Sequence, residues 1–273
     1  MGYVAGDKLT SGGGNILMSS YAGCSITTGT CNLILGYESG KCVAGSHNNF
    51  LGAYAGRLAE GSGHVFIGKC AGHCITGNCN ISLGIGALHG SSTASNNTGS
   101  FNFAGGYASG KCLTSGTHNV FLGTYSAKLS TTLTSAVIIG CGAGTNLSTG
   151  DRNVFLGKYA GGTVSGGTDS VYIGCGAGKS NVSGNQNVAI GFHANADGSG
   201  GTSGVFLGNC SGRCMKGTSN IAVGAGALLG SSSVGTNTGG YNIAIGCLSG
   251  CKMSSGTYNV FAGQYAGLSL IHI

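Results

Sequence analysis

Cysteine is the residue type in this chain that offers the most chemistry. The sequence contains 13 cysteines, and three pairs are separated by three residues: Cys70/Cys74, Cys210/Cys214 and Cys247/Cys251. A tight turn could bring the Cα atoms of such a pair within bridging range, so corner disulfides are one interpretation. Zinc usually needs four ligands, and no second Cys or His set has matching spacing. We favour free thiols that act as small, partly buried hydrophobic side chains, with the disulfides as the alternative and no metal site.

The carboxylates do not form a pattern that predicts catalysis. Only six acidic residues are present, and they show no pairing in the sequence that would suit acid–base chemistry. Glycine-rich strings similar to phosphate-binding loops recur throughout the chain and belong to its repeat. We therefore predict that the protein is not an enzyme and needs no cofactor.

A short repeat positions these side chains. Its consensus is Asn-φ-x-φ-Gly-x-x-(Ala/Ser)-Gly, where φ is apolar, as in residues 153–161. We number each copy from the Asn position, called 0, and fifteen copies begin at residues 15, 32, 48, 64, 80, 102, 119, 136, 153, 170, 187, 204, 220, 242 and 259. Position +7 is Ala or Ser in every copy, and position +4 is Gly in all but one. The copies that begin at Asn80 and Asn220 are longer than the others and lie at equivalent places of a duplicated eight-copy block.

Composition restricts the fold that this repeat can form. Glycine contributes 58 of 273 residues and proline none, which excludes long helices and collagen. A hydrophobic content of 41% argues against disorder. We predict an all-β protein, a parallel β-solenoid or β-roll of about fifteen coils, each of roughly 16–17 residues. An alternation of Tyr and Cys between successive copies leaves one alternative open, a turn of about 34 residues made of two half-turns.

Each position of the repeat has an expected place in the coil. Side chains alternate along a strand, so we expect positions +1 and +3 to face inward and +2 outward. Glycine at +4 and +8 supplies corner conformations that other residues resist. The small residue at +7 and an apolar residue near +11 are expected to fill a narrow interior. Asn at position 0 is expected to bond backbone groups of its own coil or Asn side chains of neighbouring coils.

Position +2 is often aromatic. An exposed aromatic stripe usually marks an interface, so we predict chain–chain packing there, with a wider interior that takes the rings as the alternative. The residues are Phe50, Phe66, Phe121, Phe155, Tyr172, Phe206 and Phe261.

Position +9 is often basic. Stacked neighbours would form a positive stripe for anionic glycans or lipopolysaccharide phosphates, while the favoured alternative is a solvated edge that keeps the protein soluble. The residues are Lys41, Arg57, His73, Lys111, Lys128, Lys179 and Arg213. No basic and aromatic interleaving predicts nucleic-acid binding, and no apolar run reaches the ~18–20 residues that cross a membrane.

The repeat defines a single predicted domain, residues 1–267, which we expect to be truncated at both ends. Residues 2–6 fit positions +4 to +8 of a copy that would begin before Met1. Residues 268–273 break the repeat and look like a translated sequencing adapter, so we interpret them as a non-native tail. The two longer copies add loops at residues 93–99 and 234–239, the best candidates for recognition because loops on a rigid scaffold carry function.

The repeat motif resembles the shaft repeats of bacteriophage tail fibres and, more distantly, the head repeats of trimeric autotransporter adhesins. The resemblance covers residues 2–267 and includes no self-cleaving chaperone domain, so no cleavage chemistry carries over. It implies a homotrimeric fibre, on a virion or extracellular, that binds a cell surface; the partner we expect from the +9 stripe is a cell-surface glycan or lipopolysaccharide, and from the lack of a long apolar run we expect no membrane insertion. The cysteine content departs from what such a fibre would contain.

An ice-binding β-solenoid is the alternative function. Regular solenoids with flat threonine ladders can order water, and Thr is frequent near positions +13 to +15 of the repeat. The Thr-x-Thr pattern in consecutive coils that a persuasive ice-binding face needs is absent.

Overall fold

The computed structural model describes residues 2–91, 94–230 and 237–268, and the chain divides into two compact units, residues 1–136 and residues 137–273. The described residues form fifteen strands of three residues and one short 3-10 helix, so the fold is all-β as predicted. Unit 1 contains β1 (Ile16–Met18), β2 (Leu33–Leu35), β3 (Asn49–Leu51), β4 (Val65–Ile67), β5 (Ile81–Leu83), η1 (Ala94–Asn96), β6 (Phe103–Gly105) and β7 (Val120–Leu122). Unit 2 contains β8 (Val137–Ile139), β9 (Val154–Leu156), β10 (Val171–Ile173), β11 (Val188–Ile190), β12 (Val205–Leu207), β13 (Ile221–Val223), β14 (Ile243–Ile245) and β15 (Val260–Ala262).

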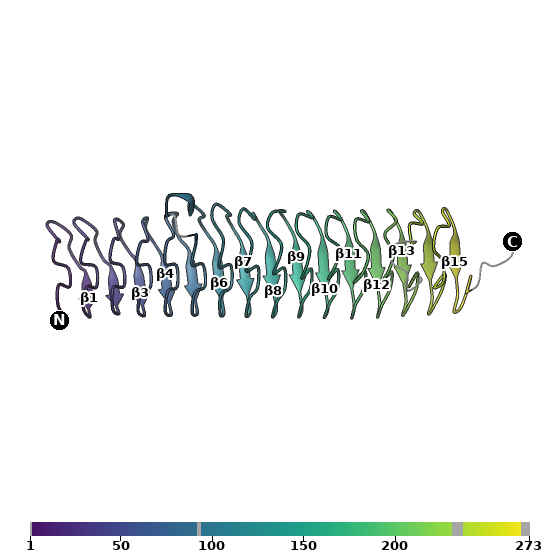
Figure 1. The fold of residues 1–273 in the computed structure, drawn as a ribbon, viewed down its shortest axis with the longest axis horizontal. Coiled ribbons are helices and arrows are strands. Elements are labelled where there is room, and N and C mark those ends of the chain that lie inside the picture. Colours follow the sequence, from purple (N-terminus) through teal and green to yellow (C-terminus); the bar gives the residue numbers. More distant parts are fainter. Residues whose placement is uncertain (1, 92–93, 231–236, 269–273) are drawn as a thin grey trace. The chain divides into compact units, whose positions relative to one another are not determined.

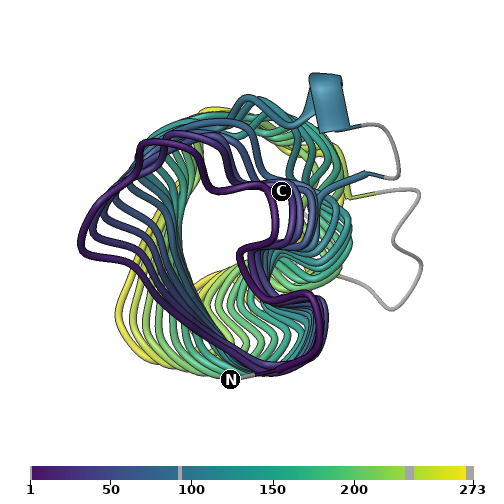
Figure 2. The same ribbon diagram turned by 90° about the vertical axis from the view of Figure 1, so that its left-hand side faces the viewer.

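Within each unit, every strand pairs in parallel with the next strand along the chain (Figure 1). Ile16 lies opposite Leu33, and Leu33 lies opposite Asn49, so each coil contributes one strand and spans a single copy of the repeat. The longer copy in unit 1 keeps this pairing, with Ile81 opposite Phe103. The predicted solenoid is confirmed, and the turn made of two half-turns is excluded because neighbours in the sheet would then lie two copies apart. In Figure 2, η1 stands outside the coils of unit 1.

The asparagines at position 0 form a hydrogen-bonded ladder within each unit. Where the preceding copy begins with asparagine, the backbone N–H of the position-0 residue donates to the Oδ1 of that asparagine, as from Asn119 to Asn102 at 3.1 Å; Asn80 donates to His64 Nδ1 and Asn187 to Ser170 Oγ instead. The Asn102 Nδ2 also donates to the carbonyl of Gly116, at 2.8 Å, which closes its own coil. Asn102 and Asn119 are buried, so each bond satisfies a group that would cost about 1–3 kcal/mol if left alone. Both predicted kinds of bond occur: to backbone groups of the same coil and between asparagine side chains of neighbouring coils.

The aromatic rings at position +2 point inward, and this corrects the predicted facing of the strands. All seven rings are at most 9% exposed: Phe50, Phe66, Phe121, Phe155, Tyr172, Phe206 and Phe261. Rings of adjacent coils stack, and the Phe50 and Phe66 centroids are 5.0 Å apart. An apolar-x-apolar triplet fits either facing, and the ring decides because burying it removes the most apolar surface from water. The predicted aromatic interface is therefore wrong, the rings fill a wider interior, and positions +1 and +3 face outward.

Glycine at +8 makes room for six of these seven rings, and the small Ala127 does so for Phe121. A Cβ on Gly72 would overlap the Phe66 ring, and the φ of Gly72 is 56°. Where position +2 is small, a buried leucine at +8 can fill the space instead; the pairs are Ser82 with Leu88 and Ala222 with Leu228. In these copies a large side chain at one of the two positions goes with a small one at the other. This correlation in the sequence indicates that both positions face the interior.

Position +4 requires glycine for two reasons. The φ of Gly36 is 140°, a conformation that other residues rarely adopt, and a Cβ there would overlap the backbone of Gly52 in the next coil. Ser19 is the exception and has a φ of 103°. The small side chain at position +7 and the apolar side chain at position +11 are buried as predicted, for example Ala22 and Ile26, each 0% exposed.

Two further corners, at positions −1 and +6, are left-handed although most of their residues are not glycine. Position −1 has φ values such as 59° at Phe101 and 60° at Tyr258, and position +6 has 61° at Tyr21. A left-handed conformation costs an ordinary residue roughly 1–2 kcal/mol, which stacking between coils must offset. The residue types did not predict these corners, and they turn many of these side chains outward.

Candidate interaction surfaces

The outer face of each sheet is covered by the side chains at positions +1 and +3, which we call the aliphatic strip. In unit 2 the strip consists of the first and third residues of β8–β15, and every one is Val, Ile, Leu or Ala. In unit 1 it consists of the same residues of β1–β7, where Asn49 and Gly105 lack an aliphatic side chain and Phe103 is aromatic. Exposure is substantial, 42% at Ile67 and 51% at Ile245. No charged residue occurs in either strip.

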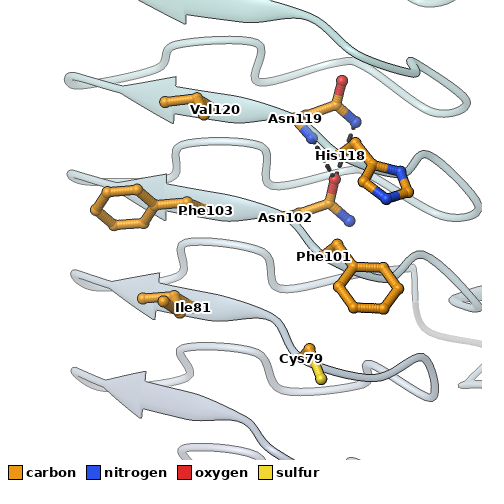
Figure 3. Close-up of a pocket in the computed structure, with 8 residues that line it drawn as sticks. All are labelled: Cys79, Ile81, Phe101, Asn102, Phe103, His118, Asn119 and Val120. Carbon is orange, nitrogen blue, oxygen red and sulfur yellow. Dashed lines mark hydrogen bonds between the residues drawn. The ribbon is translucent and has the colours of Figure 1, made fainter.

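A hollow of about 400 Å³ lies beside the strip in unit 1. In Figure 3 the side chains of Ile81, Phe103 and Val120 stand on one side of it and those of Phe101 and His118 on the other. The floor of the hollow is formed by Asn102 and Asn119 of the asparagine ladder. Both residues are buried and do not project into the hollow. The hollow is therefore open and shallow. One wall belongs to the aliphatic strip and includes the Phe103 ring, and the other is the aromatic wall formed by Phe101 and His118.

The aromatic wall recurs in unit 2. Phe101 stacks on His118 with centroids 5.1 Å apart, and the equivalent residues of the duplicated block, Tyr241 and Tyr258, stack at the same distance. Both pairs occupy position −1 in the two coils that follow a longer copy. Sequence reasoning missed these pairs, although the duplicated block keeps planar rings there and so carried the signal.

The basic residues at +9 form a continuous column in unit 1 only. Six consecutive coils contribute Lys41, Arg57, His73, His89, Lys111 and Lys128. Backbone hydrogen bonds join adjacent coils next to position +9; for example, Cys42 N–H donates to the Arg57 carbonyl at 3.0 Å. His89 was missed from the sequence; its ring stacks on His73 at 4.8 Å. In unit 2 the coil that carries Ala196 separates Lys179 from Arg213.

Acidic partners reduce the charge at the start of this column. Arg57 Nε lies 2.6 Å and Lys41 Nζ 3.4 Å from the same Glu38 oxygen, and the hydrogen bond from Arg57 lowers the pKa of Glu38. Burial, aided by nearby His89 and Arg57, lowers the pKa of His73 to about 4, so this ring is neutral near pH 7. Among the described residues, Lys111, which is exposed, and Lys128 are the lysines of this column that form no ion pair.

Lys128 is held over a ring. Its Nζ lies 4.7 Å from the centroid of the Tyr125 ring, a distance suited to a cation–π contact. In unit 2, by contrast, Arg213 Nε lies 2.8 Å from a carboxylate oxygen of Asp197. At position +9, therefore, Lys128 of unit 1 lies over an uncharged ring, whereas Arg213 of unit 2 is paired with a carboxylate.

All thirteen cysteines are free thiols, including the three pairs considered for corner disulfides. Cys74, Cys214 and Cys251 are buried, while their partners Cys70 and Cys210 are half-buried and Cys247 is exposed. In each pair the second cysteine is therefore more buried than the first, and no disulfide joins the two. Burial raises the pKa of Cys74 and Cys214, which makes these two thiols poor nucleophiles.

The candidate recognition loops are only partly described: residues 93 and 234–236 lie outside the described residues. Within 94–99, Asn97 is buried, and its Nδ2 donates to the carbonyls of Cys74, at 2.8 Å, and Ser91, at 3.0 Å. Asn237, its equivalent in the duplicated block, is also buried, and its carbonyl accepts a bond from Lys216 N–H at 2.8 Å. Sequence reasoning assigned no role to these asparagines, which join each longer copy to the coil before it.

Comparisons with known proteins identify no relative of this chain: no family model, curated protein or solved structure matches it. In the part of the chain that the structure describes, no helix is long and apolar enough to cross a membrane. The same residues hold no cluster of three or more His, Cys, Asp or Glu side chains that suits a metal ion.

Proposed function

We propose that this chain is the structural shaft of a fibrous virion or cell-surface protein that contributes to host attachment. The observation that carries the proposal is the combination of ladders inside each unit. Backbone pairing, the asparagine ladder and the stacked rings all join one coil to the next, so each coil supports its neighbours. An architecture of this kind supplies length and stiffness and needs no enclosed active site. Bacteriophage tail-fibre shafts and adhesin heads, which the repeat resembles, would use it in this way.

The attachment part of the proposal rests on the +9 column of unit 1. Lys111 and Lys128 lie in adjacent coils, about 4.8 Å apart along the sheet, and neither is an ion-pair partner of the acid that holds Lys41 and Arg57. Two such cations match the closely spaced phosphates of lipopolysaccharide or the acidic groups of a surface glycan.

The test is binding of the purified chain to phosphatidylcholine vesicles with and without lipopolysaccharide, at low salt. We expect Lys111→Thr/Lys128→Thr to weaken binding to the lipopolysaccharide vesicles about tenfold or more, because two adjacent cations are removed. The matched control is Lys179→Thr/Arg213→Thr, which removes the same charge from the same column of unit 2 and should change affinity by less than about twofold. Equal losses in both variants would show that net charge alone binds, and absent binding by the unaltered chain would refute attachment through this column.

No observation favours the ice-binding alternative. At the threonine-rich level of the coil, the Thr30 hydroxyl lies 3.2 Å from Ser46 Oγ, and the Thr30 N–H donates to the same oxygen at 3.0 Å. This hydroxyl is used within the fold. A thermal-hysteresis measurement separates the two functions, and we expect no activity.

A further inference from the structure

The aliphatic strip is an unusual surface for a protein to leave in water. Parallel sheets occur almost only where both faces are covered, and here the inner face is covered by the coil's own core. The outer face carries aliphatic side chains at all sixteen positions in unit 2, with Ile190 39%, Ile245 51% and Val260 70% exposed. The repeat keeps these positions apolar in coil after coil, although every one of them is half-buried or exposed at the surface.

The size of the strip fits a specific interface. Eight strands ~4.8 Å apart, each about 10 Å long, present a face of roughly 400 Å² in unit 2, and the seven strands of unit 1 give slightly less. Each strip alone is as large as the largest apolar patch of a typical monomer, ~300–600 Å².

The chemistry of the strip identifies its occupant. It contains no charge, which excludes a partner recognised by ion pairs. Its rows of side chains, many of them β-branched and stiff, repeat once per strand, so a complementary surface needs grooves at the same spacing over seven or eight strands. The surface known to have that spacing is the strip of another copy of this chain. Sheets pack face to face at ~10 Å in this way.

We propose that the aliphatic strip packs against the strips of further copies of this chain. Two copies can bury their strips face to face, and three can surround a common axis because each strip is only two side chains wide. This interface replaces the one first expected at the aromatic rings. It does not depend on the attachment proposed above, which uses the opposite kind of chemistry at position +9.

The experiment is the mass of the purified chain in solution at ~10 µM, measured by sedimentation equilibrium at a salt concentration where polyanion binding is screened. We expect two or three times the chain mass of 26.6 kDa. Val188→Lys/Val205→Lys places two charges on facing residues of β11 and β12 and should weaken association at least 100-fold. Gln186→Lys/Ser203→Lys adds the same charges slightly earlier in the same coils, at exposed positions, and should leave the mass unchanged.

Circular dichroism shows whether each variant folds, and Val188→Thr/Val205→Thr provides a milder change of similar shape if the lysine variant does not. We expect the threonine variant to weaken association about tenfold. A folded, unaltered chain that is a monomer at this concentration would overturn the proposal. So would an oligomer that survives both strip variants, because its contacts would then lie elsewhere. Loss of lipopolysaccharide binding with the mass intact affects only the proposed attachment.

Discussion

Positions +2 and +8 of a coil share one space in its interior. Phe66 at +2 lies against Gly72 at +8, whereas Leu88 at +8 lies in the coil whose +2 residue is Ser82. Close packing makes any change at one position felt at the other. The glycine at +8 is therefore a consequence of the ring as well as of the left-handed backbone.

A double-mutant cycle tests this sharing of space. Gly72→Leu alone should destabilise the protein by about 3 kcal/mol, since it overpacks the coil, and Phe66→Ala alone by about 3–5 kcal/mol, since it leaves a cavity. The double variant imitates the Ser82/Leu88 coil, so its cost should be smaller than the sum by at least about 1–2 kcal/mol. Urea unfolding measures all three, and additive costs would contradict the explanation.

His64 occupies an asparagine position in the ladder and makes that rung sensitive to acid. It is 0% exposed; its Nδ1 accepts the Asn80 N–H at 3.2 Å, and its Nε2 faces the Glu60 carbonyl at 3.1 Å. Burial lowers its pKa below the usual value near 6.5. The folded state therefore resists the proton more than the unfolded state does, and stability falls as pH drops below ~6.5.

His64→Asn should remove this part of the acid sensitivity. Near pH 7.5 we expect a similar free energy of unfolding, because Asn restores the rung found in most copies. Between about pH 6.5 and 5 the unaltered chain should lose more stability than the variant, and urea unfolding at each pH measures the difference. His118→Asn, at an exposed position, is the control. Parallel pH profiles for His64→Asn and the unaltered chain would show that His64 is not responsible.

At the scale of the element, three-residue strands are too short to be stable alone, and each depends on bonds to the next coil. The asparagine ladder supplies these bonds just before each strand begins. Asn102 shows the arrangement. Its Oδ1 accepts the N–H of Asn119 at the start of the next coil, and its Nδ2 donates to the Gly116 carbonyl of its own coil. The ladder therefore fixes both the closure of a coil and its register with the next.

Asn102→Ala should cost about 2–4 kcal/mol, because it leaves the buried Asn119 N–H and Gly116 carbonyl without their partners. Asn259→Ala is the comparison, since Asn259 is half-buried and begins the last copy of the repeat; it should cost less than about 1 kcal/mol. Urea unfolding gives both values, and hydrogen exchange at the Asn119 amide locates the loss. Similar costs at the two sites would contradict a ladder that depends on burial.

At the scale of the whole molecule, the duplicated block repeats surface features as well as coils. Each unit has one longer copy tied by a buried asparagine, followed by a stacked pair of exposed rings.

The two proposed interactions, polyanion binding and self-association, should respond differently to salt. Polyanion binding at the +9 column should weaken as salt is added, whereas association through the uncharged strip should not, because burial of apolar surface does not depend on charge.

Much of this fold could be predicted from the sequence because it depends on local requirements. The short period, the parallel coils, glycine at +4 and +8, and the small side chain at +7 follow from how few residues must complete a turn. The asparagine ladder followed from its spacing and its bonding groups. The surface was predicted less well: the basic side chains at +9 were identified, but only the structure showed that they are continuous in unit 1 and that Glu38 holds two of them.

By itself, the sequence determined the repeat, the type of fold and the positions where chemistry is available. The tertiary structure decided which side of each strand faces the core. Alternation along a three-residue strand is consistent with either choice, and the choice depends on volume: a ring at +2 fits where a small residue at +8 of the same coil, glycine in six of the seven copies and Ala127 beside Phe121, leaves room for it. That contact joins positions +2 and +8 through the folded coil, and it turned the aliphatic residues of the strip outward. The tertiary structure also decided that the paired cysteines are free thiols, with the second cysteine of each pair more buried than the first.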